Sequence, residues 1–236
     1  FPPPPPTPIL SGLVGSEMCI RDSESSDEFL IIKKNPLILP PDYEEMPVPV
    51  GDDTEILIEN VLKITKQKSK LNILDIGTGS GCILLSLLKE RKDFYGTGID
   101  ISKKCLNISK LNAIKLKVTT KLKLYKSNVD KFNLGKYDLI VSNPPYIKKS
   151  DLKCLEKDIG FEPKQALDGG LDGLSEIRKV INKSSELIKR NGHFIIEIGF
   201  DQKNKVKKIL RDKKFYIKKT VKDLLNHDRC IVSIKT

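Results

Sequence analysis

The sequence lacks the features of a metal-binding or disulfide-stabilised domain. Its five cysteines are odd in number and widely spaced, none belongs to a C-x-x-C pair, and only two histidines are present. This pattern argues against a zinc site and against a disulfide framework, so we expect no bound metal. Scattered thiols are typical of a reducing compartment, and we therefore expect a cytoplasmic protein.

Long hydrophobic runs are absent as well. No apolar stretch approaches the roughly 18 residues needed to cross a bilayer, so we expect a soluble protein. The 236 residues, 39% of them hydrophobic, are enough for one α/β domain with a short extension. Lys and Arg outnumber Asp and Glu by 42 to 31, a formal charge of +11. This excess favours a nucleic-acid or ribosome-associated partner about as much as a solvated lysine surface.

The first 50 residues differ in composition from the rest of the chain. Residues 1–25 begin with a polyproline run and continue without a hydrophobic period. We expect this low-complexity segment to be disordered and non-native, with a polyproline ligand for an SH3-like partner as the alternative. Residues 26–50 contain two short apolar runs and then a Pro-rich, acidic stretch, which predict a hairpin and a linker ahead of the core.

Residues 51–236 alternate between strand-like and helix-like segments. The hydrophobic patterns predict strands at 71–76, 94–100, 121–126, 137–142, 193–199, 215–221 and 230–234. They predict helices at 54–66, 82–91, 102–113, 174–190 and 204–211. This alternation indicates an α/β fold with a mostly parallel, Rossmann-like sheet of seven strands, covered by helices on both faces and closed by an antiparallel strand. Ligands of such sheets bind beyond the carboxyl ends of the strands.

A glycine-rich loop follows the first strand of this core. The segment reads LDIGTGSGC, which places Gly77, Gly79 and Gly81 where backbone N–H groups can approach a ligand. A dinucleotide fold favours glycine at position 82, which is cysteine here, so NAD is disfavoured. The spacing D-x-G-x-G-x-G instead resembles motif I of the S-adenosylmethionine methyltransferases. Asp100 ends the next strand, where a carboxylate can accept hydrogen bonds from ribose hydroxyls.

A second motif follows the fourth strand and reads N-P-P-Y. Two prolines remove two backbone donors, so carbonyl oxygens are left to accept hydrogen bonds. Asn143 and Pro144 can offer one oxygen each to the two hydrogens of a planar NH2 group, and Tyr146 can stack on that group. Such a site needs no strong general base. The alternative interpretation of the motif is a rigid turn without a catalytic role.

A third motif, FEPKQALDGGLDGL, distinguishes between adenine and glutamine as the substrate of a methyltransferase that acts on planar NH2 groups. With the segments LDIGTGSG, GID, VSNPPYI and FEPKQALDGGLDGL in this order over residues 35–236, the sequence resembles the PrmC/HemK family of peptide chain release factor glutamine N5-methyltransferases. The resemblance implies the class I S-adenosylmethionine-dependent methyltransferase fold and methylation of the glutamine in the Gly-Gly-Gln motif of class I release factors. We expect a monomer that needs no direct contact with nucleic acid.

The resemblance also implies roles for individual residues. The residues that would bind S-adenosylmethionine are Gly77, Thr78, Gly79, Ser80, Gly81, Asp100, Asn128, Val129 and Asn143. Among them Asp100 would hold the ribose, and Asn128 and Val129 would meet the adenine. The residues that would receive the substrate glutamine are Asn143, Pro144, Pro145 and Tyr146, and Glu162 would anchor the downstream loop.

Two departures from the family pattern affect the expected activity. The family's P-R-P-[DE]-T-E segment corresponds to PVGDDTE at residues 49–55, which has no arginine. Too few residues precede position 29 to form the family's helical N-terminal domain. We therefore expect a truncated reading frame that binds S-adenosylmethionine and methylates release factors weakly. The alternatives are an adenine N6-methyltransferase, a ribosomal protein glutamine methyltransferase and a catalytically silent binding module.

Overall fold

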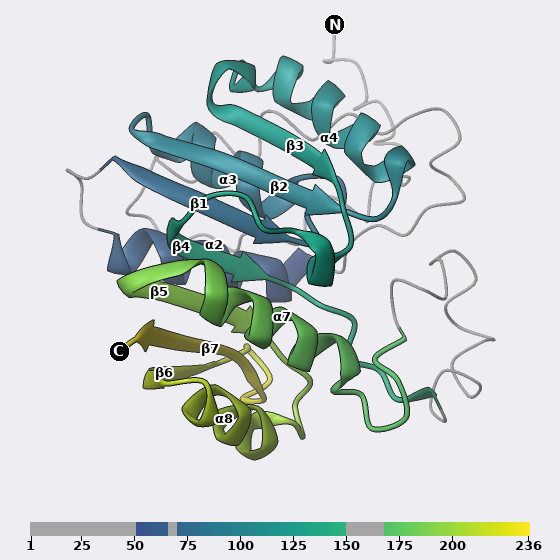
Figure 1. Cartoon of the computed structure of the whole chain (residues 1–236), viewed down its shortest axis with the longest axis vertical. Helices are drawn as coiled ribbons and strands as arrows, with labels where there is room; N and C mark the ends of the chain where they lie inside the picture. Colours follow the sequence, from purple (N-terminus) through teal and green to yellow (C-terminus); the bar gives the residue numbers. More distant parts are fainter. Residues whose placement is uncertain (1–50, 66–69, 150–167) are drawn as a thin grey trace, which may run out of the picture.

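The computed structural model describes residues 51–65, 70–149 and 168–236. In this part of the chain seven strands form one sheet in the order β3-β2-β1-β4-β5-β7-β6 (Figure 1). The strands are β1 (Leu71–Ile76), β2 (Phe94–Asp100), β3 (Leu122–Lys126), β4 (Tyr137–Ser142), β5 (Ile188–Glu197), β6 (Phe215–Lys222) and β7 (Asp228–Lys235). Strands β3, β2, β1, β4 and β5 pair in parallel, whereas β7 runs antiparallel to β5 and to β6. The predicted sheet and its antiparallel strand are confirmed; the predictions for residues 1–25 and 26–50 lie outside the described residues.

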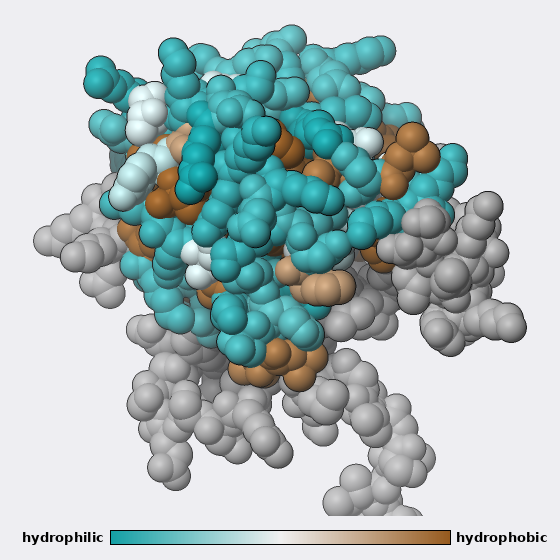
Figure 2. Space-filling model, turned by 90° about the horizontal axis from the view of Figure 1, so that it is seen from below, coloured by the Kyte–Doolittle hydropathy of each residue, from teal (hydrophilic) through white to brown (hydrophobic). Residues whose placement is uncertain are grey.

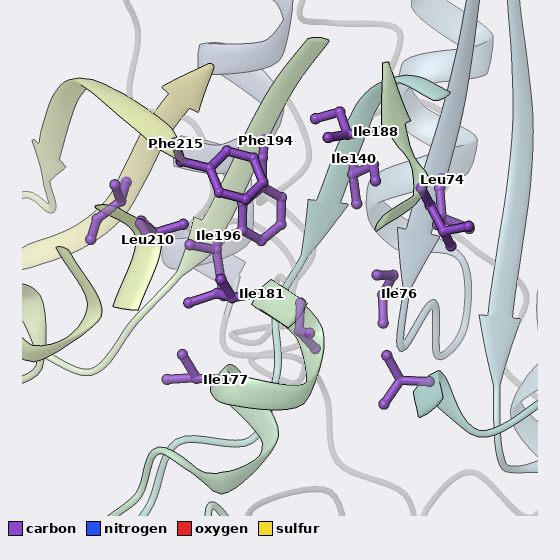
Figure 3. Close-up of a cluster of buried hydrophobic side chains, with 14 of the residues drawn as sticks. Leu74, Ile76, Ile140, Ile177, Ile181, Ile188, Phe194, Ile196, Leu210 and Phe215 are labelled. Atoms are coloured by element: carbon purple, nitrogen blue, oxygen red, sulfur yellow. The ribbon is translucent and has the colours of Figure 1, made fainter. Parts of the chain in front are cut away.

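Helices cover both faces of the sheet, as the alternation predicts. One face carries α2 (Gly51–Ile64), α3 (Cys82–Glu90) and α4 (Lys103–Lys115), and the other carries α7 (Ser175–Leu187) and α8 (Lys203–Asp212) (Figure 1). Two hydrophobic clusters result, one between the sheet and each helical layer. Figure 3 shows the cluster beneath α7 and α8, where Ile177 and Ile181 face strand residues such as Ile140 and Phe194.

The central strands are buried on both faces, which explains their continuous apolar sequences. Successive side chains of a strand point to opposite faces. In β1, Ile73 accordingly packs under α2 and α3, whereas Leu74 packs in the cluster beneath α7 and α8. Both side chains are completely buried. Ile73 and Leu74 therefore each pack one of the two helical layers against the sheet.

The predicted helix over residues 174–190 is wrong at its end. Helix α7 ends at Leu187, and β5 begins at Ile188 rather than at His193. Ile188 pairs with Tyr137 of β4, and the register then shifts so that Leu139 pairs with His193. Because Ile188 is 5% exposed and continues the apolar period of the helix, the sequence pattern alone does not separate the two conformations. Pairing with β4 decides between them.

The face of the molecule shown in Figure 2 is mostly hydrophilic. Figure 2 shows the end of the molecule at which α8, β6 and β7 lie, with hydrophobic side chains as separate patches among polar ones. Within the described ranges, none of the helices combines the length and the apolar character that a membrane span requires.

Candidate functional site

The predicted site residues follow neighbouring strands at one edge of the sheet. Parallel pairing aligns Ile76 of β1 with Ile99 of β2 and with Ser142 of β4, and Asp100 with Lys126 of β3. The carboxyl ends of these strands therefore meet at the same edge (Figure 1). The predicted residues stand along this edge in the order Asn128, Asp100, Gly77, Asn143, which follows the strand order β3-β2-β1-β4.

The three glycines of the loop after β1 have two different functions. All three have positive φ, at 77° for Gly77, 56° for Gly79 and 86° for Gly81. A Cβ added to either of the first two would meet no atom within 4 Å, whereas a Cβ on Gly81 would lie 2.6 Å from Ser109 Oγ and 2.8 Å from Leu85 Cδ1. The first two glycines thus face open space that a ligand can fill, and the third allows α3 and α4 to pack closely.

A buried amide from α4 supports this loop. Asn112 is fully buried, and its Nδ2 donates a hydrogen bond of 3.1 Å to the carbonyl oxygen of Ser80. The contact fixes the loop between Gly79 and Gly81 against the helical layer. The sequence analysis missed Asn112, because its partner lies 32 residues away and no local pattern marks the pair.

The carboxylate of Asp100 is held in place by backbone donors. Its Oδ2 accepts the N–H of Gly79 at 2.9 Å, and its Oδ1 accepts the N–H of Ser102 at 2.8 Å. These bonds orient the carboxylate beside the glycine loop. Each oxygen keeps a further lone pair, so the half-buried group can still accept two hydroxyl hydrogen bonds. This geometry suits the predicted contact with a ribose.

A second acid, Asp75, lies in β1, two residues before Gly77 of the same loop. It is 1% exposed, and Thr78 Oγ1 donates to its Oδ2 at 2.8 Å. Burial raises the pKa of Asp75 to about 7; the Thr78 hydrogen bond opposes this shift and the nearby charge of Asp100 adds to it. Its Oδ1 is buried without a hydrogen-bond partner among the described residues. A positive charge brought close to this carboxyl would favour its ionised form.

The residues after β3 adjoin Asp100 on its other side. The N–H of Ser127 donates to the carbonyl oxygen of Asp100 at 3.0 Å. Asn128 is exposed, and its Oδ1 accepts the N–H of Asp130 at 3.0 Å, which begins a short 3-10 helix, Val129–Lys131. Val129 packs with Phe132 in the hydrophobic core. The backbone here is placed to border a ligand held by Asp100, and contact of these residues with adenine stays a prediction.

The N-P-P-Y motif leaves β4 directly beside the glycine loop. Ser142 Oγ donates to the carbonyl oxygen of Ile76 at 2.7 Å, which fixes β4 to β1 just before the two loops. Asn143 is partly buried and Pro144 is buried. Among the described residues, no donor is hydrogen-bonded to Asn143 Oδ1 or to the Pro144 carbonyl. Both predicted acceptor oxygens are therefore uncommitted.

The end of the motif is held by a residue that the sequence analysis missed. Gln202 is 2% exposed, and its Nε2 donates to the carbonyl oxygens of Tyr146 and Gly173, each at 3.0 Å. Its Oε1 accepts the N–H of Gly199 at 3.0 Å. One amide thus joins the acceptor motif to two other segments, and its partner Tyr146 packs against the core beneath α7 and α8.

The glycine-rich segment before α7 packs against the acceptor motif. The N–H of Gly169 donates to Ile147 O at 2.8 Å, and the N–H of Lys149 donates to Gly170 O at 3.0 Å. A Cβ on Gly173, where φ is 73°, would lie 2.6 Å from the carbonyl oxygen of Tyr146. This approach requires glycine. Glu162, the predicted anchor of the segment, lies outside the described residues.

The chain matches the methyltransferase small domain family over residues 50–218. It is 37% identical to the release factor glutamine methyltransferase of Caulobacter vibrioides over 185 residues, or 78% of this chain and 64% of that protein. It is 39% identical to the protein of the same name from Fusobacterium nucleatum over 186 residues, 78% of this chain and 52% of that one. The predicted resemblance to this family is confirmed. The chain spans less than two thirds of the length of these relatives.

Solved structures agree on the fold. A methyltransferase from Pyrococcus furiosus superposes with a TM-score of 0.62 at 12% identity, covering 88% of this chain and 94% of that one. A ribosomal protein L11 methylase from Lactobacillus delbrueckii superposes with a TM-score of 0.56 at 19% identity, covering 78% and 77%. These likenesses confirm the predicted class I methyltransferase fold.

Proposed function

Because the chain belongs to the methyltransferase small domain family, we propose that it transfers the methyl group of S-adenosylmethionine to a glutamine side-chain nitrogen. The proposed substrate is the glutamine of the Gly-Gly-Gln motif of class I release factors, and the names of the relatives support it. The observation that carries the proposal is the pair of uncommitted oxygens, on Asn143 and Pro144, beside the open glycine loop.

The residues at the strand edge fit this cofactor. S-adenosylmethionine supplies an electrophilic methyl group and carries positive charge next to it. Asp100 is placed to accept hydrogen bonds from the ribose of the cofactor. Gly77 and Gly79 leave room for the methionine part of the cofactor. The buried carboxyl of Asp75 adjoins this loop and favours the positive charge.

The acceptor residues activate and orient a weak nucleophile. An amide nitrogen is a poor nucleophile because its lone pair is delocalised into the carbonyl. The oxygens of Asn143 and Pro144 accept one amide hydrogen each, which holds the nitrogen in place and raises its electron density. Tyr146 stacks on the planar amide. With the nitrogen held in line with the methyl group, the nitrogen–carbon bond would form as the methyl–sulfur bond breaks, which leaves a neutral thioether. This orientation would supply much of the acceleration, and the surplus proton of the product would leave afterwards to water.

The described residues of the candidate site all come from one chain, which supports action as a monomer. Within the described residues Cys105 and Cys230 are free thiols, which supports a reducing, cytoplasmic location. We include both in the proposal.

Labelled S-adenosylmethionine tests the function directly. We expect the chain to label a class I release factor, and not the same factor with alanine in place of the glutamine of its Gly-Gly-Gln motif. The substitution Asn143→Ala should lower the labelling rate at least tenfold, since it removes one of two acceptors for the same NH2 group. Label in duplex DNA and none in the release factor would refute the proposal and favour an adenine methyltransferase.

A further inference from the structure

Four strongly exposed hydrophobic side chains lie near the candidate site. Among the described residues, the large hydrophobic side chains with the greatest exposure are Leu224 at 92%, Leu171 at 89%, Leu225 at 76% and Phe200 at 64%. Leu171 lies in the segment between β4 and α7, Phe200 follows β5, and the other two lie in the turn after β6. All three segments leave the carboxyl ends of strands at the edge that carries Asn143. Large apolar side chains that are exposed on neighbouring loops of one edge are a sign of an interaction surface.

The three segments contact one another and the acceptor motif. Gln202 joins Gly173, two residues after Leu171, to Tyr146, and its Oε1 binds the N–H of Gly199. The ring of Phe200 lies 5.7 Å from the ring of His227 in the turn between β6 and β7. The apolar side chains therefore extend from the acceptor motif across neighbouring loops of one surface.

The turn that carries the two leucines is rigidly built. Asp223 Oδ1 accepts the N–H of His227 at 2.8 Å, and its Oδ2 accepts Arg229 Nε at 2.9 Å. The N–H of Asp223 in turn donates to His227 O at 2.9 Å. These bonds close the turn, so Leu224 and Leu225 are presented by an ordered backbone. Preorganisation of this kind lowers the entropy cost of binding a partner.

We propose that Leu171, Phe200, Leu224 and Leu225 form a substrate-docking surface that binds apolar side chains of the release factor around its Gly-Gly-Gln loop. This inference rests on the proposed function. A folded protein that places a loop against Asn143 must also cover the segments that border the motif on the β5 and β6 side. Burial of the four side chains by that protein removes their apolar surface from water.

A matched pair of variants tests the surface in the full chain. The first variant carries Leu224→Gln and Leu225→Gln and changes the docking surface. The control variant carries Leu111→Gln and Ile114→Gln, at two residues of α4 that are 47% and 57% exposed. We expect the first variant to raise the KM for a class I release factor at least tenfold, because two exposed leucines that the bound partner would cover are replaced by polar side chains. The control should change this KM less than twofold. A short Gly-Gly-Gln peptide, which does not reach the turn, should keep the same KM with both variants.

The outcomes separate the surface from the function on which it rests. If the wild-type chain labels the release factor but the KM of the Leu224 and Leu225 variant equals that of the control, the docking surface is refuted and the function stands. If the wild-type chain does not label the release factor, both the proposed function and the proposed docking surface are refuted. A change from dimer to monomer in gel filtration, with KM unchanged, would assign the surface to self-association and overturn the proposal.

Discussion

Replacement of Gln202 by glutamate tests whether this side chain supports the acceptor motif without affecting the glycine loop. The substitution keeps the size of the side chain and keeps an oxygen to accept the N–H of Gly199. It replaces the amide nitrogen, which donates to Tyr146 O and Gly173 O, by a second oxygen. An oxygen without a proton cannot donate, so the acceptor motif loses its bond to the segment before α7 while the surrounding packing is retained.

The expected loss in kcat/KM follows from the hydrogen bonds that are lost. Two hydrogen bonds contribute roughly 1 kcal/mol each, and repulsion between the new oxygen and buried carbonyls adds a similar amount. Their sum is roughly 3 kcal/mol, which corresponds to about a hundredfold loss in kcat/KM if the acceptor motif must be ordered for reaction. Protonation of the glutamate restores one donor, so part of the activity should return as pH falls.

Asparagine 112 provides the matched control. Asn112→Asp makes the same amide-to-acid change in another buried side chain, which supports the glycine loop through Ser80 O. We expect Gln202→Glu to reduce methyl transfer with S-adenosylmethionine affinity retained, and Asn112→Asp to reduce that affinity. Calorimetric titration and single-turnover labelling measure the two effects. Equal kcat/KM for Gln202→Glu and the wild-type chain, or equal loss of cofactor affinity in both variants, would refute the assignment of Gln202 to the acceptor motif.

Two further predictions concern the loop after β1. Burial raises the pKa of Asp75 from 3.8 to about 7, so the folded chain keeps a proton that the unfolded chain releases above about pH 4. The free energy of unfolding should therefore fall by up to roughly 4 kcal/mol between pH 4 and pH 7, and it should change little above pH 7. Asp75→Asn should remove this slope in urea unfolding, and an unaltered slope would contradict the buried acid. Gly79→Ala should weaken cofactor binding and cost about 1 kcal/mol of stability, whereas Gly81→Ala should cost about 3 kcal/mol, since its Cβ would also collide with Ser109; similar melting temperatures for the two variants would contradict this difference.

The central strands could be predicted from the sequence because each is a short apolar run that ends in a glycine, an acid or a polar loop. The boundaries of β1, β2 and β4 agree with those predicted at 71–76, 94–100 and 137–142. The end of α7 could not be predicted, because Ile188 continues the helical period and only its pairing with Tyr137 makes it a strand residue. Local sequence patterns predict a helix or strand correctly when its burial is regular. They do not predict its end where residues that continue the helical pattern pair instead with a strand distant in the sequence.

The same distinction applies to the site. The glycine loop and N-P-P-Y carry their geometry in adjacent residues, so the spacing alone identifies them. Gln202 has partners that lie 56 and 29 residues away. A buried glutamine before a helix has no local signal that distinguishes it from a solvent-facing one. Support for a motif by a distant residue becomes visible only when the chain is folded.

The strand order determines from which side a protein substrate can approach. Residues proposed for the adenosine end follow β3 and β2, the open glycines follow β1, and the acceptor oxygens follow β4. A cofactor bound in this order occupies the β3 and β2 part of the edge, so the remaining approach to Asn143 is over β5, β7 and β6. This is the part of the edge at which Phe200, Leu224 and Leu225 are exposed. Under the proposed function, the sheet topology therefore places cofactor and substrate on opposite sides of the reacting nitrogen, and the apolar side chains lie on the side left to the substrate.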